Sequence, residues 1–262
     1  MRYSTIEFSV DGGVAIVTLN RPDQLNCFNE TMHAEIREVF QEIENNPSLR
    51  CLVMTGKGRG FCAGQDLNDR KFSKVVRPDL GESLAQNYNP LIRTITTLEM
   101  PVICAVNGVA AGAGANIALA CDIVLAARSA SFVQAFCKIG LIPDSGGSWS
   151  LPRLVGLPRA RGLALLGERI PADQAQQWGM IWKCVDDDKL MEETLVMARH
   201  FETQPTKGLA LIKQALRAST ANSLDEQLDL EEELQRIAGR THDYREGALA
   251  FLEKRKPDFK GK

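Results

Sequence analysis

Apolar residues in the first half of the chain follow two spacings, one typical of strands and one typical of helices. Two runs rich in β-branched residues flank Asp11-Gly12-Gly13, which predicts a β-hairpin near the N-terminus. Between residues 30 and 46, apolar side chains recur at helical intervals: Met32, Ile36, Val39, Phe40 and Ile43. Strand and helix patterns therefore succeed one another from the start of the chain.

Two short and continuously apolar runs follow, CLVMTG at 51–56 and PVICAVNG at 101–108, and such runs are typical of buried strands. Between them, residues 82–98 have helical spacing. The stretch GAGANIALACDIVLAA at 112–127 predicts a glycine-led helix followed by another strand. Strands that alternate with helices indicate an α/β fold with crossover connections.

From about residue 157 onward, almost every segment has helical spacing, and only short breaks separate the segments. The pattern therefore predicts an α/β core followed by a helical C-terminal region. No internal repeat and no low-complexity linker divides the two parts.

Composition and charge exclude several classes of protein. The 262 residues carry a net charge of −2, so we expect no nucleic-acid partner. No apolar stretch is long and charge-free enough to span a bilayer, and the N-terminus lacks the pattern of a signal peptide. We therefore expect a cytoplasmic protein that has no membrane partner.

The residues that most often bind metals are scattered. The three histidines lie far apart, so we expect no metal site. No Cys-x-x-Cys pair occurs, and most cysteines lie in apolar runs, which indicates free thiols in a reducing compartment. The seven are Cys27, Cys51, Cys62, Cys104, Cys121, Cys137 and Cys184.

Two loops rich in small residues follow buried strands, FCAGQDL at 61–67 and GVAAGAGAN at 108–116. Small residues let a backbone approach a ligand closely, and a helix that begins in the second loop leaves its first N–H groups unpaired. Two such loops side by side could direct two N–H groups at one oxygen and stabilise an enolate. Tight strand–helix packing explains either loop alone equally well. A dinucleotide site is disfavoured because the second loop does not follow the first strand.

These motifs identify the chain as similar to the crotonase (enoyl-CoA hydratase/isomerase) superfamily. The matching pieces are VAIVTLNRPDQLNCFN, FCAGQDL, PVICAVNGVAAGAGANIALACDIVLAA and GLIPDSGG, in family order across nearly the whole chain. Within the family, AGQDLNDR, GLIPDSGGSW and DYREGALAFLEKR most resemble the isomerases of phenylacetate degradation, which convert a ring-1,2-epoxide of phenylacetyl-CoA to an oxepin. The resemblance implies a spiral of ββα units at 1–200 and a helical trimerisation region at 201–262.

The resemblance also implies the substrate and the residues that bind it. The substrate would be an acyl-CoA thioester, and no separate cofactor or metal would be needed. The backbone N–H groups of Gln65 and Ala113 would bind the thioester carbonyl, while Ala63, Gly64, Gln65, Asp66 and Leu67 would line the CoA channel. Lys254 stands where a C-terminal basic residue helps to bind CoA phosphate, although the basic C-terminal run is also typical of a solvated tail. Family members form homotrimers, commonly paired into hexamers.

Two acids of the family's hydratases are absent, and one acid remains. The hydratase glutamates correspond to Asn116 and Phe136 here, whereas Asp144 occupies the place where isomerases of the family carry a proton-transferring acid. An aspartate in a turn or a helix N-cap would also suit this position. Near Ile142 and Trp149, an acid in an apolar pocket would have a raised pKa, suited to proton transfer. Asn116 is interpreted either as a contact for the acyl group or water, or as an ordinary polar residue on a helix.

The residues thus favour an isomerase of acyl-CoA thioesters that uses an oxyanion hole and an aspartate proton shuttle. It would convert the ring epoxide to the oxepin and could shift a 3,4 double bond to the 2,3 position. One alternative is a general enoyl-CoA isomerase of fatty-acid oxidation, which a substrate panel would distinguish. Another is a non-catalytic CoA-binding protein of the same fold, which would show no turnover.

We predict that hydration of crotonyl-CoA is weak or absent. An amide at 116 and a phenyl ring at 136 cannot replace two glutamates, and general base catalysis alone contributes roughly 10²–10⁴-fold. The measurement is the loss of the enoyl absorbance with purified protein. A turnover similar to that of a true hydratase would contradict the prediction.

Overall fold

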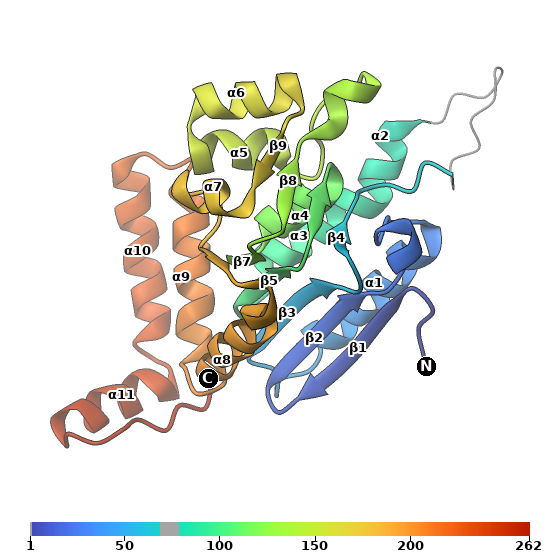
Figure 1. Ribbon diagram of the computed structural model, residues 1–262. Helices are drawn as coiled ribbons and strands as arrows, with labels where there is room; N and C mark the ends of the chain where they lie inside the picture. Colours follow the sequence, from blue (N-terminus) through green and yellow to red (C-terminus); the bar gives the residue numbers. More distant parts are fainter. Residues whose placement is uncertain (1, 69–78) are drawn as a thin grey trace.

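The computed structural model describes residues 2–68 and 79–262, and these form two sheets covered by helices (Figure 1). The larger sheet has the order β1-β2-β3-β5-β7-β10. Its strands are β1 (Ile6–Asp11), β2 (Val14–Leu19), β3 (Cys51–Gly56), β5 (Val102–Val106), β7 (Ile123–Ala127) and β10 (Lys183–Val185). Only the β1–β2 hairpin in this sheet is antiparallel, as the Asp-Gly-Gly turn predicted.

The smaller sheet has the order β4-β6-β8-β9. Its strands are β4 (Gly60–Cys62), β6 (Val109–Ala111), β8 (Ser131–Val133) and β9 (Arg169–Pro171). Strands β4, β6 and β8 are parallel, and β9 is antiparallel to β8. Each of the pairs β3–β4, β5–β6 and β7–β8 therefore gives one strand to each sheet. This repeated division of strand pairs confirms the predicted spiral α/β architecture.

Helices connect and cover the sheets. The helices before residue 160 are α1 (Glu30–Glu44), α2 (Leu80–Ser83), α3 (Asn89–Thr97), α4 (Ala113–Ala120) and α5 (Gly147–Val155). A π-helical turn at Leu84–Tyr88 joins α2 to α3. The later helices are α6 (Leu157–Leu166), α7 (Ala172–Gln177), α8 (Leu190–Glu202), α9 (Thr206–Ala218), α10 (Leu224–Ala238) and α11 (His242–Leu252). None of these described helices is long and apolar enough to cross a membrane.

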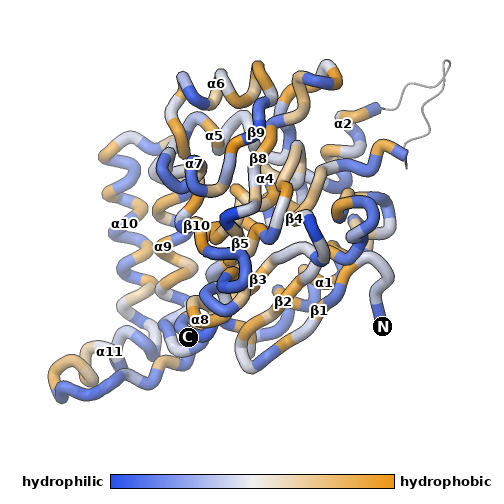
Figure 2. Tube along the Cα trace, in the orientation of Figure 1, coloured by the Kyte–Doolittle hydropathy of each residue, from blue (hydrophilic) through white to orange (hydrophobic). Residues whose placement is uncertain are grey.

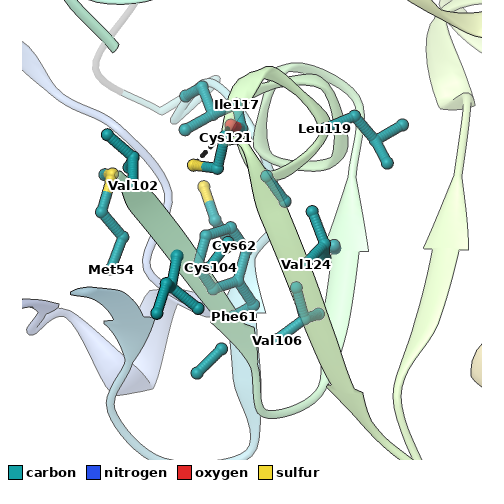
Figure 3. Close-up of a cluster of buried hydrophobic side chains, with 14 of the residues drawn as sticks. Met54, Phe61, Cys62, Val102, Cys104, Val106, Ile117, Leu119, Cys121 and Val124 are labelled. Carbon is teal, nitrogen blue, oxygen red and sulfur yellow. Dashed lines mark hydrogen bonds between the residues drawn. The ribbon is translucent and has the colours of Figure 1, made fainter. Parts of the chain in front are cut away.

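The core lies between the larger sheet, the smaller sheet and α4. Strands β3 and β5 are buried at every residue, which explains why their sequences are continuously apolar. Figure 3 shows Met54, Cys62, Cys104, Ile117 and Cys121 as members of one cluster of buried side chains. All seven cysteines are free; four are buried, and Cys27, Cys137 and Cys184 are partly buried.

The C-terminal helices are fixed to the core through α9. The Lys213 ammonium lies 2.6 Å from a carboxylate oxygen of Asp122 and donates to the Met100 carbonyl at 2.8 Å. The same Asp122 oxygen accepts the Val102 N–H, at the start of β5. Burial raises the pKa of Asp122, although the Lys213 charge opposes that rise. The division of the chain at residue 200 stays a prediction, and α8, which spans that point, packs on the core through Met191, Met197 and Phe201.

Candidate active site

The parallel strands of the smaller sheet bring the predicted loops together. Gly60 of β4 pairs with Val109 of β6, and Ala111 of β6 pairs with Val133 of β8. Neighbouring parallel strands end at the same edge of a sheet, so the segments that follow them emerge side by side. Those segments carry Gln65 after β4, Ala113 after β6, and Phe136 and Asp144 after β8.

Gly64 allows the closest approach between the first two loops. Its φ is +92°, and a Cβ placed on it would lie 3.1 Å from the Ala111 carbonyl oxygen and 3.4 Å from the Ala113 nitrogen. A side chain here would be strained by its φ and crowded by backbone atoms. The peptide that links Gly64 to Gln65 therefore lies directly beside the first residue of α4.

The two N–H groups named from the sequence have backbone surroundings that suit an oxyanion hole. In the loop after β4, the Ala63 N–H donates to the Leu25 carbonyl and the Asp66 N–H donates to the Phe28 carbonyl. Within the described residues, the Gln65 N–H donates to no backbone carbonyl. Ala113 is the first residue of α4, so its N–H has no partner within the helix. The helix dipole adds positive potential at the same point. That the two donors bind a developing negative oxygen stays a prediction.

Close packing against the end of β4 fixes the first turn of helix α4. A Cβ on Gly114 would lie 2.2 Å from the Cys62 carbonyl oxygen, so α4 packs directly on the end of β4. The Cys62 sulfur accepts the Gly64 N–H at 3.4 Å. Burial raises the pKa of this thiol to about 12, so it is neutral and serves as a packing group rather than a nucleophile.

The segment that follows β2 holds the loop after β4 in place through hydrogen bonds. Asn26 is fully buried, has a φ of +56°, and its amide donates to the carbonyl groups of Lys57, Gly60 and Phe61. The Arg21 guanidinium lies 2.8 Å from the Asp66 carboxylate, in a pair with little exposure. The NRPDQLNCFN motif therefore supplies side chains, Arg21 and Asn26, that fix the position of the loop after β4.

Of the predicted channel residues, Leu67 is the most clearly open to solvent. Its side chain is 48% exposed, whereas Asp66 is 7% exposed and bonded to Arg21. Asp66 therefore holds the loop in place, and Leu67 presents an apolar surface beside it.

Phe136 brings an aromatic ring to the third side of the site. It lies in the short 3₁₀ helix Ala135–Ile139, and a Cβ on Gly112 would be 3.7 Å from its ring tip. Gly112 immediately precedes Ala113, so this ring lies beside the start of α4. The position that carries a glutamate in the family's hydratases is thus apolar here.

Asn116 joins α4 to the segment that carries Asp144. Its amide nitrogen donates to the Asp144 main-chain carbonyl at 2.8 Å, and its oxygen accepts from the Gln134 amide at 2.8 Å. The residue is 1% exposed, and a Cβ on Gly147 would lie 2.2 Å from its amide nitrogen. Asn116 therefore holds the Asp144 segment against α4. The sequence spacing gave no signal that Gln134 bonds to Asn116 or that Gly147 packs against it.

Asp144 lies in a left-handed turn just before α5. Ser145 and Gly146 have φ values of +49° and +78°, and the Ser145 hydroxyl donates to an Asp144 carboxylate oxygen at 2.9 Å. The surroundings differ from the expected apolar pocket, because Ile142 is 80% exposed. Trp149 is 48% exposed and carries the Arg153 guanidinium 4.2 Å from its ring centre. Within a single chain, the Ile142 and Trp149 side chains therefore do not form an apolar pocket around Asp144.

Lys254 is not brought to this site by its own chain. It follows α11, which lies at the far end of the molecule from β4 and α2 (Figure 1). The sequence motif places Lys254 correctly at the end of the last helix but does not indicate which site it faces.

Across the described residues, no three His, Cys, Asp or Glu side chains gather in a group that could hold a metal ion.

Comparison with known families identifies the class of protein to which this fold belongs. A family model described as enoyl-CoA hydratase/isomerase matches residues 9–262, and the chain belongs to this family. The resemblance inferred from the sequence is therefore confirmed.

Individual relatives cover almost the whole chain. The 1,2-epoxyphenylacetyl-CoA isomerase of Escherichia coli is 59% identical over 254 residues, which are 97% of each protein. The trans-2-decenoyl-[acyl-carrier-protein] isomerase of Streptococcus mutans is 34% identical over 265 residues, covering 100% of both. A crystal structure of an enoyl-CoA hydratase from Bacillus anthracis matches with a TM-score of 0.90 at 30% identity, covering 99% of this chain and 100% of that one.

Replacing Asn116 by Leu should weaken both the fold and the site. The substitution removes one of the two donors to the Asp144 carbonyl, which also accepts from the Gly147 N–H. It also removes the acceptor of the buried Gln134 amide, and a buried polar group without a partner costs about 1–3 kcal/mol. We expect a lower free energy of unfolding in urea, together with reduced turnover. Unchanged stability and turnover would contradict the positioning role of Asn116.

Proposed function

We propose that the protein isomerises acyl-CoA thioesters and that its substrate is the ring-1,2-epoxide of phenylacetyl-CoA, which it converts to the oxepin. The observation that carries this proposal is the placement of the Gln65 and Ala113 loops against each other, beside the segment that holds Asp144. The relative from Escherichia coli, named as an isomerase of this epoxide, supports the choice of substrate.

The proposed chemistry needs only groups of this chain. The Gln65 and Ala113 N–H groups would polarise the thioester carbonyl and stabilise the enolate that forms when a proton leaves the acyl chain. Asp144 would accept that proton and return it at another carbon, so that no atom is gained or lost. In the epoxide, the same enolate character would assist expansion of the ring to the oxepin.

The neighbours of the site favour isomerisation over hydration. Phe136 places an apolar ring beside the start of α4, and the Asn116 amide is occupied by Asp144 and Gln134. Neither group can activate water as a general base. The same proton shuttle could move a 3,4 double bond to the 2,3 position, and the isomerase named in Streptococcus mutans supports this second reaction.

We also propose that the chain assembles as a homotrimer or hexamer through its C-terminal region. An apolar groove of about 490 Å³ lies between α5 and α9, where Trp149, Leu154 and Ile212 contribute to its lining. Figure 2 shows apolar residues along α9, α10 and α11. Several of them are more than half exposed: Ile212, Leu216, Leu224, Leu228, Phe251 and Leu252. Exposed apolar side chains on adjoining helices beside an apolar groove are typical of an association surface.

Oligomerisation would also give Lys254 a role. The residue lies far from the oxyanion hole of its own chain, so we propose that it binds the CoA phosphate in the site of an adjacent subunit.

The seven free cysteines support a reducing, cytoplasmic location.

Asp144→Asn tests the proposed reaction. The amide keeps the shape of the turn but removes the basic oxygen, so conversion of the epoxide thioester should fall by at least ~10²-fold. Binding of the thioester should change little, because the N–H donors remain. The rates are measured by chromatography of the products, beside the melting temperature of each variant.

Asp173→Asn is the matched control, since Asp173 is exposed in the first turn of α7. Full activity in a folded Asp144→Asn protein would return Asp144 to a structural role in its turn. Absence of epoxide conversion by the unmodified protein would exclude the proposed substrate.

Leu216→Glu tests the proposed assembly. Leu216 is 67% exposed on α9, and a charge there should prevent apolar association, so sedimentation should show smaller species than for the unmodified protein. Val10→Glu, at a 47% exposed position in the N-terminal hairpin, should leave the mass unchanged. A monomeric unmodified protein would contradict the assembly.

A further inference from the structure

The π-helical turn at Leu84–Tyr88 has a clear origin in the sequence. Pro90 has no N–H and so cannot bond to the Gln86 carbonyl, which instead accepts from the Arg37 guanidinium at 3.3 Å. The Asn89 N–H reaches back five residues to the Leu84 carbonyl. The turn is therefore wider than an α-helix, and wide turns of this kind often occur at functional sites.

The wide turn ends at Tyr88, a buried residue that contacts the oxyanion loop. Tyr88 is 1% exposed, and its ring centre lies 4.6 Å from that of His33 and 6.0 Å from that of Phe28. Its hydroxyl donates to the Gln65 side-chain oxygen at 2.9 Å. A single phenolic oxygen thus connects the π-turn to Gln65, the residue of the oxyanion loop that is proposed to bind the thioester carbonyl.

The other end of the Gln65 side chain is also bonded. Its amide nitrogen donates to the Phe28 carbonyl at 3.1 Å and to the Asp66 carbonyl at 3.4 Å. The side chain is therefore held between the Tyr88 hydroxyl on one side and the Phe28 segment on the other. The peptide that carries the Gln65 N–H is held on its other side by the Phe28 N–H, which donates to the Gly64 carbonyl at 2.8 Å. The side-chain bonds add a second restraint, on the Gln65 residue itself.

We propose that Tyr88 is a positioning residue for the oxyanion hole, acting through the Gln65 side chain. The inference rests on the proposed function, in which the Gln65 N–H stabilises the enolate. Such stabilisation depends on donors that are aligned before the charge develops. Tyr88 keeps this donor directed at the carbonyl oxygen, while it does not itself contact the thioester.

The first test is Tyr88→Phe, which keeps the buried ring and removes only the hydroxyl. Loss of an entire oxyanion donor costs roughly 10²–10³-fold in kcat. Because the donor here remains but is less well aligned, we expect a fall in kcat of about tenfold, with KM nearly unchanged. Tyr3→Phe, at a residue that is 8% exposed and lies beside β1, is the matched control and should keep full kcat.

A double-mutant cycle with Gln65→Leu separates positioning from a general effect on stability. Gln65→Leu alone should lower kcat by a similar factor, because it removes all three side-chain bonds while keeping the backbone N–H. In the Gln65→Leu background, Tyr88→Phe should then have no further effect on kcat. Independent, multiplicative effects would overturn the proposal, as would full kcat in a folded Tyr88→Phe protein.

A spectroscopic readout keeps this inference distinct from the proposed reaction. Bound cinnamoyl-CoA absorbs at longer wavelength when its carbonyl is polarised, whether or not the protein isomerises any substrate. We expect Tyr88→Phe and Gln65→Leu each to reduce this red shift, and Tyr3→Phe to preserve it. An unchanged red shift in Gln65→Leu would overturn the proposal even if Tyr88→Phe failed to fold. A normal red shift with no epoxide conversion would instead refute the proposed substrate alone.

Discussion

The parallel pairing of β4, β6 and β8 is the constraint on which the site depends. Because the three strands run in the same direction, the segments that follow them emerge at one edge of the smaller sheet. The spacing between adjacent strands is about 4.8 Å, close to what two N–H groups need in order to share one oxygen. Gly64 and Gly114 allow the close approach of these segments. A side chain at Gly114 would collide with the Cys62 carbonyl, and one at Gly64 would be crowded by backbone atoms and strained by its φ of +92°.

The polar groups around this edge serve mainly to hold backbone segments in place. Asn26 and the Arg21–Asp66 pair fix the loop after β4, and Asn116 fixes the segment after β8. Each is buried and bonded, which is costly to disturb because an unpaired polar group in a protein interior has lost its water. The proposed chemistry is therefore carried by main-chain N–H groups and one carboxylate, with a surrounding set of side chains that orients them.

The family and the architecture were predictable because they depend on local patterns. Continuous apolar runs marked β3 and β5, and the Asp-Gly-Gly turn marked the first hairpin. The motif order then indicated the family, which comparison confirmed. Patterns of this kind are readable because burial and turn geometry restrict the residue type at each position.

The sequence by itself determined the N-terminal hairpin, the strands β3, β5 and β7, the glycine loops and the absence of both hydratase acids. It did not indicate the short strands of the smaller sheet, and the prediction of a helical chain after about residue 157 was wrong at β9 and β10, because three-residue strands carry too little pattern to be recognised. Only the tertiary structure decided what Asn116, Asp66 and Tyr88 do, because the side-chain partners described above lie between 18 and 45 positions away along the chain. It also decided that Lys254 lies far from the site of its own chain. Spacing reports which face a residue occupies within one element, whereas hydrogen-bond partners arise from the packing of different elements.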